Sequence, residues 1–300
     1  MYAALQALLL RLAFVSVVAL PVFAQSDEGN SEPTTITIGT WNLSNLASQD
    51  EGVQPRSFDD LRILASYARR LGADVIAVQE VSDERVLNSV FGENYVFHLS
   101  NRSSELKTGF AIRKEVQFTP LPDFADLATS PGLRHGTQIE LNLSGQTLRL
   151  MSVHLQSGCL DEKSEDSADN EHDCEKLAEQ VPFLSKWFEQ TTSQTDHVVI
   201  LGDFGRHLAD RGGDWILDEL NQIAPIKSAM TGFEPLCWRN KQSQYTAHFL
   251  LTKPVQDSVV SDSFREVTFA ASHKRIATDE QGRELLYPSD HCPITVELEY

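Results

Sequence analysis

Positive charge is scarce in this 300-residue chain. Lysine and arginine number 25 against 43 aspartates and glutamates, which gives a formal net charge of -18 at pH 7. A field of that sign repels polyanions, so the composition excludes a protein that attracts nucleic acid through its overall charge. Contact with phosphate therefore needs a bound cation or a local basic patch, and metal-assisted binding is favoured. The residues available for a patch are Arg102, Lys107, Arg113, Lys114 and Arg134.

Long apolar runs are also few. Residues 12–20 form one such run, followed by a small-residue cleavage pattern that ends at Ala24. This predicts a secretory signal peptide over residues 1–24; an uncleaved membrane anchor is the alternative, because Arg11 is the only charged side chain before the run. No later run approaches the roughly 18 apolar residues that span a bilayer. We therefore expect a periplasmic or secreted protein with a flexible leader over residues 25–34.

Cysteine is limited to Cys159, Cys174, Cys237 and Cys292. An even number in an exported chain favours two disulfides, although three pairings are open, and the spacing is not that of a zinc site. We favour Cys159 with Cys174 because they bracket one acidic stretch, which leaves Cys237 with Cys292. That stretch, residues 160–173, is predicted to be a solvated loop, since its acids lack the spacing of an EF-hand calcium loop.

Apolar strand patterns recur along the rest of the chain. Residues 35–41 and 74–80 are predicted strands, and residues 58–71 between them carry apolar side chains at helical spacing. Further strands are predicted at 95–99, 108–113, 137–143, 147–154, 198–203, 245–251 and 294–299, and further helices at 177–188 and 215–220. No internal repeat or low-complexity linker divides residues 35–300, so we expect one α/β domain there.

Five of the strand ends carry side chains that bind metals or move protons: Asn42, Glu80, His154, Asp203 and the pair Asp290-His291. Taken singly, each has a structural explanation as a turn, a cap or a buried histidine. Strands of one sheet whose carboxyl ends meet would gather carboxylates, an amide and two imidazoles in one place. Such a set is suited to binding a hard cation and hydrolysing a phosphate ester.

The ordered motifs TWNL, VQE, SVHL, LGDF and PSDHCPI resemble those of the endonuclease/exonuclease/phosphatase superfamily, also called the deoxyribonuclease I-like family, and in particular its exported bacterial branch. The resemblance implies a four-layer α/β/β/α sandwich with a phosphodiesterase site that uses Mg²⁺ or Mn²⁺. Nucleic acid is the family's commonest substrate; a phospholipid head group ranks lower, because no exposed aromatic hairpin is evident. Nothing in the sequence indicates an oligomeric state.

The resemblance also implies roles for single residues. Glu80 would be the principal Mg²⁺ ligand, helped by Asn42 and Asp290. His154 would bind the scissile phosphate. Asp203 would position or deprotonate the attacking water.

His291 would act as an acid or base, or would stabilise charge on the phosphate, and Arg113 would add a phosphate contact. Two positions depart from the family pattern. Gly205 stands where an asparagine donor is expected, and Ala247 stands where an aspartate would orient the imidazole of His291. Loss of preorganised donors and orienting acids of these kinds lowers rates by about 10²–10³ or more.

These departures leave two hypotheses. The chain is either an exported phosphodiesterase with a slow or rearranged site, or a catalytically silent relative that binds a ligand or partner through the same residues. A smaller alternative is that His248 or His207 replaces a lost contact.

Overall fold

The computed structural model describes residues 34–47, 56–103, 106–159, 168–208, 214–233, 236–237, 246–278 and 284–300. The predicted signal peptide and nearly all of the predicted leader lie outside these ranges. Thr34, the last leader residue, exchanges backbone hydrogen bonds with Tyr300 at 2.9 and 3.0 Å, so it already belongs to the folded domain. Within the described ranges, no helix is long and apolar enough to cross a bilayer.

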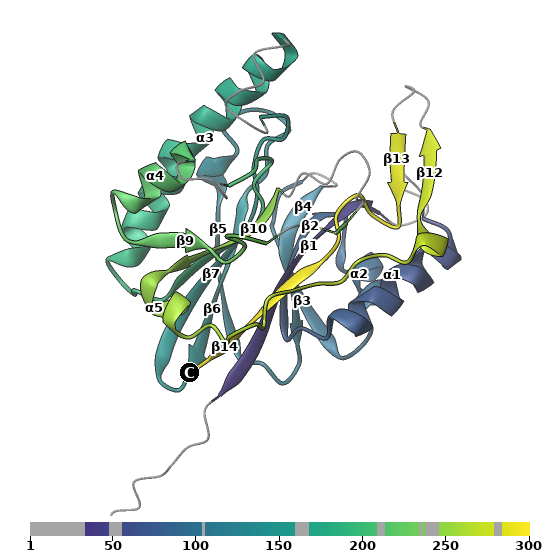
Figure 1. The fold of residues 1–300 in the computed structure, drawn as a ribbon, viewed down its shortest axis with the longest axis horizontal. Coiled ribbons are helices and arrows are strands. Elements are labelled where there is room, and N and C mark those ends of the chain that lie inside the picture. The colour runs from purple at the N-terminus through teal and green to yellow at the C-terminus, as the bar shows by residue number, and fades with distance from the viewer. Residues whose placement is uncertain are drawn as a thin grey trace, which may run out of the picture. The chain divides into compact units, whose positions relative to one another are not determined.

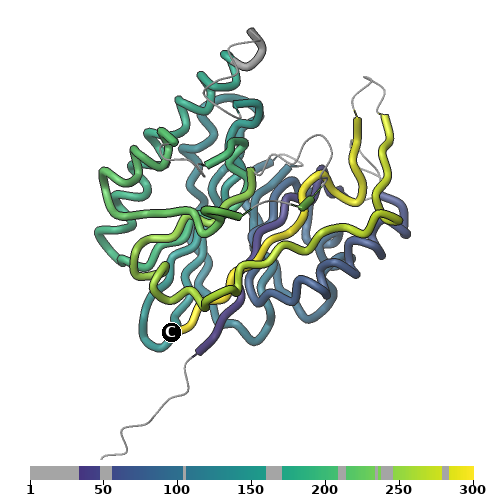
Figure 2. Tube along the Cα trace, in the orientation of Figure 1, coloured from purple at the N-terminus to yellow at the C-terminus, as the bar shows by residue number. Residues whose placement is uncertain are grey.

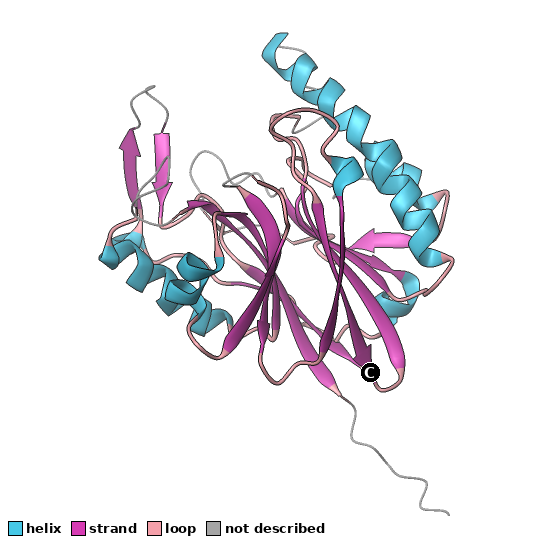
Figure 3. Cartoon of the chain, turned by 180° about the vertical axis from the view of Figure 1, so that it is seen from behind, coloured by secondary structure: helices cyan, strands magenta, loops and turns pink. Residues whose placement is uncertain are grey.

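Two mixed sheets form the centre of the domain, and they face each other in Figure 3. Sheet A has the strand order β11-β14-β1-β2-β4-β3, and sheet B has the order β5-β6-β7-β8-β10-β9. In sheet A the strands are β1 Thr35–Leu46, β2 Val75–Val81, β3 Tyr95–Leu99, β4 Lys107–Arg113, β11 Arg265–Glu266 and β14 Ile294–Glu299. In sheet B they are β5 Phe118–Phe124, β6 Gly136–Leu143, β7 Gln146–His154, β8 Val198–Asp203, β9 Ile226–Ser228 and β10 Ala247–Thr252.

Helices cover the outer faces of the two sheets (Figure 1). On sheet A lie α1 (Phe58–Leu71) and α2 (Glu84–Phe91), and on sheet B lie α3 (Ala168–Thr192) and α4 (Trp215–Asn221); the short α5 spans Lys253–Asp257. A separate hairpin is formed by β12 (Arg275–Thr278) and β13 (Glu284–Tyr287). The purple N-terminal strand β1 and the yellow C-terminal strand β14 run side by side in Figure 2, and they pair antiparallel. The predicted four-layer α/β/β/α sandwich is therefore confirmed.

The central strands are apolar on both faces because each sheet is covered twice. In β2, Val75 and Ala77 pack between the sheets, whereas Ile76 and Val78 pack under the helices of sheet A. Strand β8 shows the same alternation on sheet B. Successive strand residues point to opposite faces, which explains why these strands read as continuous apolar runs.

The space between the sheets changes from apolar to polar toward one end. There Gln79 exchanges hydrogen bonds with Thr40 at 3.2 and 3.3 Å, and its amide nitrogen lies 3.3 Å from Ser152 Oγ on the other sheet. All three residues are fully buried. We call this end, where β1, β2, β7 and β8 finish, the polar end of the sheets. A buried hydrogen-bond layer that joins the two sheets fixes their register just below it.

Both favoured disulfides are present, Cys159–Cys174 and Cys237–Cys292. The prediction of a loop over residues 160–173 is wrong in its last part, because α3 begins at Ala168 and Cys174 is helical. Pro182 also lies inside α3 without ending it. Acidic side chains are compatible with a surface helix as well as with a surface loop, so the polarity of this stretch did not distinguish the two.

A buried arginine ties the loops at the polar end together. Arg56 is 1% exposed. Its Nη1 donates to Pro288 O at 2.9 Å, and its Nη2 donates to Leu43 O at 3.1 Å and to Ser44 O. The guanidinium also lies 4.7 Å from the centroid of the Tyr287 ring. It therefore joins the end of β1 to the segment that follows β13.

We expect Arg56→Met to lower the free energy of unfolding by about 2–4 kcal/mol, because it leaves buried carbonyls without their charged donor. Urea unfolding measures this. Arg62→Met is the matched control: Arg62 pairs with Asp59 across one turn of α1, and both side chains are 78% exposed. The control should change stability by less than about 0.5 kcal/mol. Equal effects of the two substitutions would contradict this stabilising role of Arg56.

Candidate functional site

The predicted strand ends converge, but from two sheets rather than one. Asn42 and Glu80 belong to β1 and β2, which run parallel in sheet A. His154 and Asp203 end β7 and β8, which run parallel in sheet B and pair at these two residues. His291 follows β13 and lies 3.6 Å from Asp203 through its Nε2. Parallel neighbours finish at the same edge of a sheet, so each sheet brings two of these side chains to the polar end.

Asn42 joins the two sheets at the centre of this cluster. Its Nδ2 donates to Glu80 Oε1 at 3.0 Å and to Asp203 Oδ2 at 2.9 Å, while its Oδ1 accepts the Ser44 N–H at 2.9 Å. Asn42 and Asp203 are 1% and 2% exposed. In this arrangement the amide positions two carboxylates. Its role as a metal ligand stays a prediction.

Glu80 reaches the site through a β-bulge. By strand alternation its side chain would follow Ile76 and Val78 toward the helices. The register of β2 shifts between Gln79 and Val81, and Glu80 has a φ of 59°. The left-handed backbone turns the side chain toward Asn42. The carboxylate also accepts the Asn45 N–H at 2.8 Å through Oε2. Such strain in a non-glycine residue persists only where the surroundings hold it, and it is concentrated at functional sites.

The pKa values of the two site histidines, His154 and His291, are shifted in opposite directions. His154 is almost fully buried, and its Nε2 lies 3.8 Å from both Glu80 Oε1 and Asp203 Oδ2. Burial, reinforced by the Arg134 guanidinium, lowers the pKa of His154 to about 4. Removal from water also disfavours the charged form of His291, but the surrounding carboxylates outweigh it and raise the pKa of His291. At neutral pH the cluster therefore holds one neutral imidazole and one that readily carries a proton.

Asp203 remains ionised although it is buried. Burial favours its neutral form, but the charges of His291 and His154 and hydrogen bonds from Gly205 and Asn42 hold the pKa of Asp203 below its usual range. The Gly205 N–H lies 2.9 Å from Asp203 Oδ1. A buried carboxylate with these donors is a fixed negative charge at neutral pH.

Arg134 is a site residue that sequence reasoning placed only in a general basic patch. Strand β6 pairs with β7 so that Thr137 lies opposite Ser152, which brings the residues before β6 beside His154. The charge of Arg134 acts on Glu80, Asp203 and His154. Its Nε is buried and has no hydrogen-bond partner among the atoms described. The register of the β6–β7 hairpin, which the Ser144-Gly145 turn predicts, was the signal that would have found it.

Arg113 does not join the cluster. It lies opposite the start of β2, about 17 Å along the strand from Glu80. Its Nε is 3.3 Å from Asp74 Oδ1, and its Nη2 donates to Gly72 O at 3.1 Å. The expected phosphate contact is therefore not supported: β4 runs antiparallel to β2, so the end of β4 lies away from the polar end.

The two departures from the family pattern lie beside Asp203. Ala247 on β10 pairs directly with Asp203 and faces the space between the sheets. Gly205 has a φ of 63°, and a Cβ there would lie 2.1 Å from Gln156 O, so this backbone cannot take an asparagine side chain without moving. His248 points the other way, where its Nε2 accepts the Leu208 N–H at 3.1 Å, so it does not replace a lost contact. The alternative involving His207 stays a prediction.

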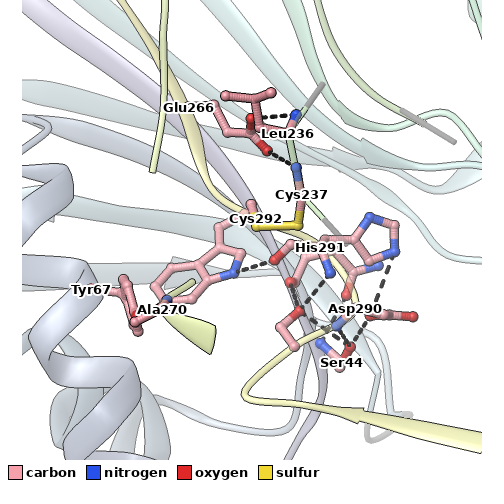
Figure 4. The surroundings of a disulfide bond; sticks show 12 residues. Ser44, Tyr67, Leu236, Cys237, Glu266, Ala270, Asp290, His291 and Cys292 are labelled. Carbon is pink, nitrogen blue, oxygen red and sulfur yellow. Dashed lines mark hydrogen bonds and ion pairs between the residues drawn. A yellow bond between two sulfur atoms is a disulfide. The ribbon is translucent and has the colours of Figure 1, made fainter. Parts of the chain in front are cut away.

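The Cys237–Cys292 disulfide lies directly beside His291 (Figure 4). His291 is further held by its backbone carbonyl, which accepts the Trp41 Nε1–H at 3.0 Å. An oxygen of Glu266 lies within 4.8 Å of both sulfurs. Because the sulfurs are bonded to each other, they cannot serve as thiolate ligands, and the bridge instead fixes the backbone that carries His291.

The donor set at the polar end fits a hard divalent cation. The carboxylates of Asp290, Asp203 and Glu80 all act electrostatically on His291. Asp290 accepts a hydrogen bond from the Ser44 hydroxyl. Its side chain is 50% exposed and that of Glu80 16%, so both are accessible from solvent. Carboxylate oxygens are the ligands that Mg²⁺ and Mn²⁺ prefer.

Comparison with known proteins gives a consistent result. The model of the Endonuclease/Exonuclease/phosphatase family matches residues 39–291. No curated protein sequence matches the chain. A truncated TDP2 from Caenorhabditis elegans is similar in structure, with a TM-score of 0.57 and 17% identity over 89% of this chain and 98% of that chain.

Two phosphatases are also similar in structure. A mannosyl-6-phosphatase from Bacteroides thetaiotaomicron has a TM-score of 0.55 and 12% identity over 88% of this chain and 100% of that chain. A 3′ phosphatase from Neisseria, bound to a product DNA hairpin, has a TM-score of 0.51 and 16% identity over 88% of this chain and 100% of that chain. At these identities the likeness shows the fold alone, and it confirms the deoxyribonuclease I-like sandwich.

We expect the imidazole of His154 to titrate near pH 4 and that of His291 above the ordinary 6.5, measured by NMR in EDTA. Unfolded His154 has the ordinary pKa, so the unfolded chain binds more protons between pH 6.5 and 4. The free energy of unfolding is therefore highest, as far as His154 is concerned, above pH 6.5, and it decreases as the pH falls from 6.5 to 4. His154→Gln should flatten that loss, whereas the control His172→Gln, at an exposed imidazole, should not.

Proposed function

We infer, since the chain belongs to the Endonuclease/Exonuclease/phosphatase family, that it is an exported, divalent-metal-dependent phosphoester hydrolase that acts on a phosphodiester. The observation that carries this inference is the pair of carboxylates, Glu80 and Asp203, held by one amide between two imidazoles. Two disulfides and the apolar N-terminal run support export.

The metal would be held by Glu80 and Asp290, the two site carboxylates that solvent reaches. When bound, Mg²⁺ or Mn²⁺ polarises a phosphoryl oxygen and offsets its negative charge. Asp203 is ionised and buried, so it is the group that orients the attacking water and accepts its proton. Because its pKa lies below the usual range, Asp203 is a weak base, and it takes the proton only as the new P–O bond forms, while His291 gives its own proton to the leaving oxygen.

The two histidines divide the remaining work. His154 stays neutral, so its Nε2–H donates to the phosphate without adding a charge that would pair with Asp203. His291 has a raised pKa and is partly exposed, so it supplies a proton or a positive charge to the oxygen that leaves. Arg134 adds a guanidinium that binds phosphate oxygens with two parallel hydrogen bonds.

The substrate class is supported by chemistry common to the similar proteins. The similar structure from Neisseria is a 3′ phosphatase with a DNA product, and the one from Bacteroides is a sugar phosphatase. Phosphate esters are what these sites have in common. The acid His291 would serve the alkoxide leaving group of a monoester or a diester, so the choice of a diester rests on the resemblance of the motifs to the family.

We expect the chain to hydrolyse bis(p-nitrophenyl) phosphate and to nick plasmid DNA with Mg²⁺ or Mn²⁺, and EDTA should stop both reactions. Glu80→Gln should lower kcat/KM by about 10³ or more, because it removes the charge that holds the metal. Glu93→Gln, at an exposed carboxylate near the end of α2, is the matched control and should have no effect. Turnover that persists in EDTA, or that survives Glu80→Gln, would contradict the proposal.

We also expect Ala247→Asp to raise kcat about tenfold or more with little change in KM, because it restores, opposite Asp203, the carboxylate that the family pattern uses to orient the imidazole of His291. Ala247→Asn, which has the same size without the charge, is the control and should not raise kcat. Activity in Ala247→Asp alone, with none in the natural chain, would instead favour the second hypothesis, a silent relative that binds through this site.

A further inference from the structure

The basic residues of the sequence are divided between the two ends of the sheets. Strand β4 starts at Lys107, opposite the finish of β2, and ends at Arg113, opposite its start. Arg113 and Lys114 therefore lie away from the site. Arg102 precedes β4 and Arg134 precedes β6, so both lie at the polar end. In a chain of net charge -18, this is a local concentration of cations next to the carboxylates.

Asp123 holds the two loops that carry these arginines together. Its Oδ2 accepts the Asn101 N–H at 2.7 Å and lies 3.3 Å from His135 Nδ1. Asn101 is the residue before Arg102, and His135 is the residue after Arg134. One carboxylate on the end of β5 thus contacts the backbone of one loop and a side chain of the other, and its Oδ2 is already used by these two partners.

Neither arginine makes a direct ion pair with a described residue, although the carboxylates of Glu80 and Asp203 act on Arg134 from a greater distance. Among the residues that the structure describes, Arg102 and Arg134 form no ion pair, and the polar contact of Arg102 is a 3.5 Å approach to Leu106 O. Because Asp123 contacts the residue next to each arginine, the two guanidiniums lie within electrostatic reach of each other, and burial and the charge of Arg134 lower the pKa of Arg102. Two like charges held close together repel each other, and an anion bound between them offsets this repulsion.

We propose that Arg102 and Arg134 form a subsite for a second phosphoryl group of the substrate, next to the phosphate that is cleaved. Arg134 is the shared member: its charge acts on Glu80 and Asp203 on one side and on Arg102 on the other. The subsite makes the chain selective for substrates with two neighbouring phosphates over isolated diesters. It deepens the proposed function and rests on it for the cleaved phosphate.

Three thymidine substrates test the proposal: the dinucleotide with one diester, the same dinucleotide with a 5′-phosphate, and the trinucleotide with two diesters. The second and third separate a terminal phosphate from an internal one as the source of the second group. For the natural chain we expect kcat/KM about tenfold higher for at least one of them than for the first, mainly through KM, as the loss of a charge-assisted hydrogen bond would predict.

Arg102→Ala should reduce this preference to about one, and Arg102→Lys should keep part of it. Lys114→Ala removes an exposed cation at the opposite end of β4 and is the matched control, which should keep the full preference. Equal preference ratios in Arg102→Ala and Lys114→Ala would overturn the subsite. So would a natural chain that shows no preference for a second phosphate.

Binding measured without turnover separates this inference from the proposed function. Fluorescence anisotropy of a labelled, 5′-phosphorylated oligothymidylate in EDTA should give a Kd about tenfold weaker for Arg102→Ala than for Lys114→Ala. The slope of log K against log salt should fall by about 0.7, the value for one phosphate contact to a single strand. If the two variants differ in Kd but the natural chain hydrolyses nothing, the proposed function is wrong and the subsite stands. If the natural chain hydrolyses its substrates but the two variants bind equally, the subsite is wrong and the proposed function stands.

Discussion

The site depends on one side-chain amide that bridges two sheets. Asn42 donates to a carboxylate of its own sheet, Glu80, and to one of the facing sheet, Asp203. Two carboxylates brought this close in a largely dry setting repel each other strongly. An amide that offers one hydrogen to each makes their approach tolerable and fixes their separation. The buried contacts among Thr40, Gln79 and Ser152 lie directly below and hold the sheets at the spacing that this bridge requires.

The sequence predicted the strands because both of their faces are apolar, and it predicted the polar strand ends because each stops at a functional side chain. It could not predict how these ends meet. The motifs come from two sheets, and Glu80 would face the helices if β2 were regular. Only the bulge at Glu80, with its positive φ, brings the carboxylate into the site. A bulge leaves no composition signal in a run such as VIAVQEV, so periodicity alone misses it.

Arg113 and Arg134 also show what strand patterns alone could not predict. Arg113 and Arg134 each stand next to a strand: the local β6–β7 hairpin indicates at which end of the sheet Arg134 falls, whereas local sequence does not tell this for Arg113. Strand direction decides: β4 carries Arg113 away from the polar end, whereas β6 starts there with Arg134 just before it. Direction follows from pairing partners far along the chain, and these are properties of the whole fold. The disulfide pairing was easier to predict: Cys159 and Cys174 are close along the chain, and pairing them leaves Cys237 with Cys292.

The two departures from the family pattern, Gly205 and Ala247, both affect the surroundings of Asp203. Gly205 donates its backbone N–H to Asp203 in a turn that packs on Gln156, and this turn leaves no room for an asparagine side chain. Without an aspartate at position 247, Asp203 lies 3.6 Å from His291 and 3.8 Å from His154, while Asp290 approaches only His291, at 3.7 Å, and Glu80 approaches His154, at 3.8 Å. One buried charge therefore serves both imidazoles. Asp290 and Asp203 both raise the pKa of His291, and the charge of His291 in turn lowers that of Asp203, so a change at Asp203 alters acid, base and phosphate contact together.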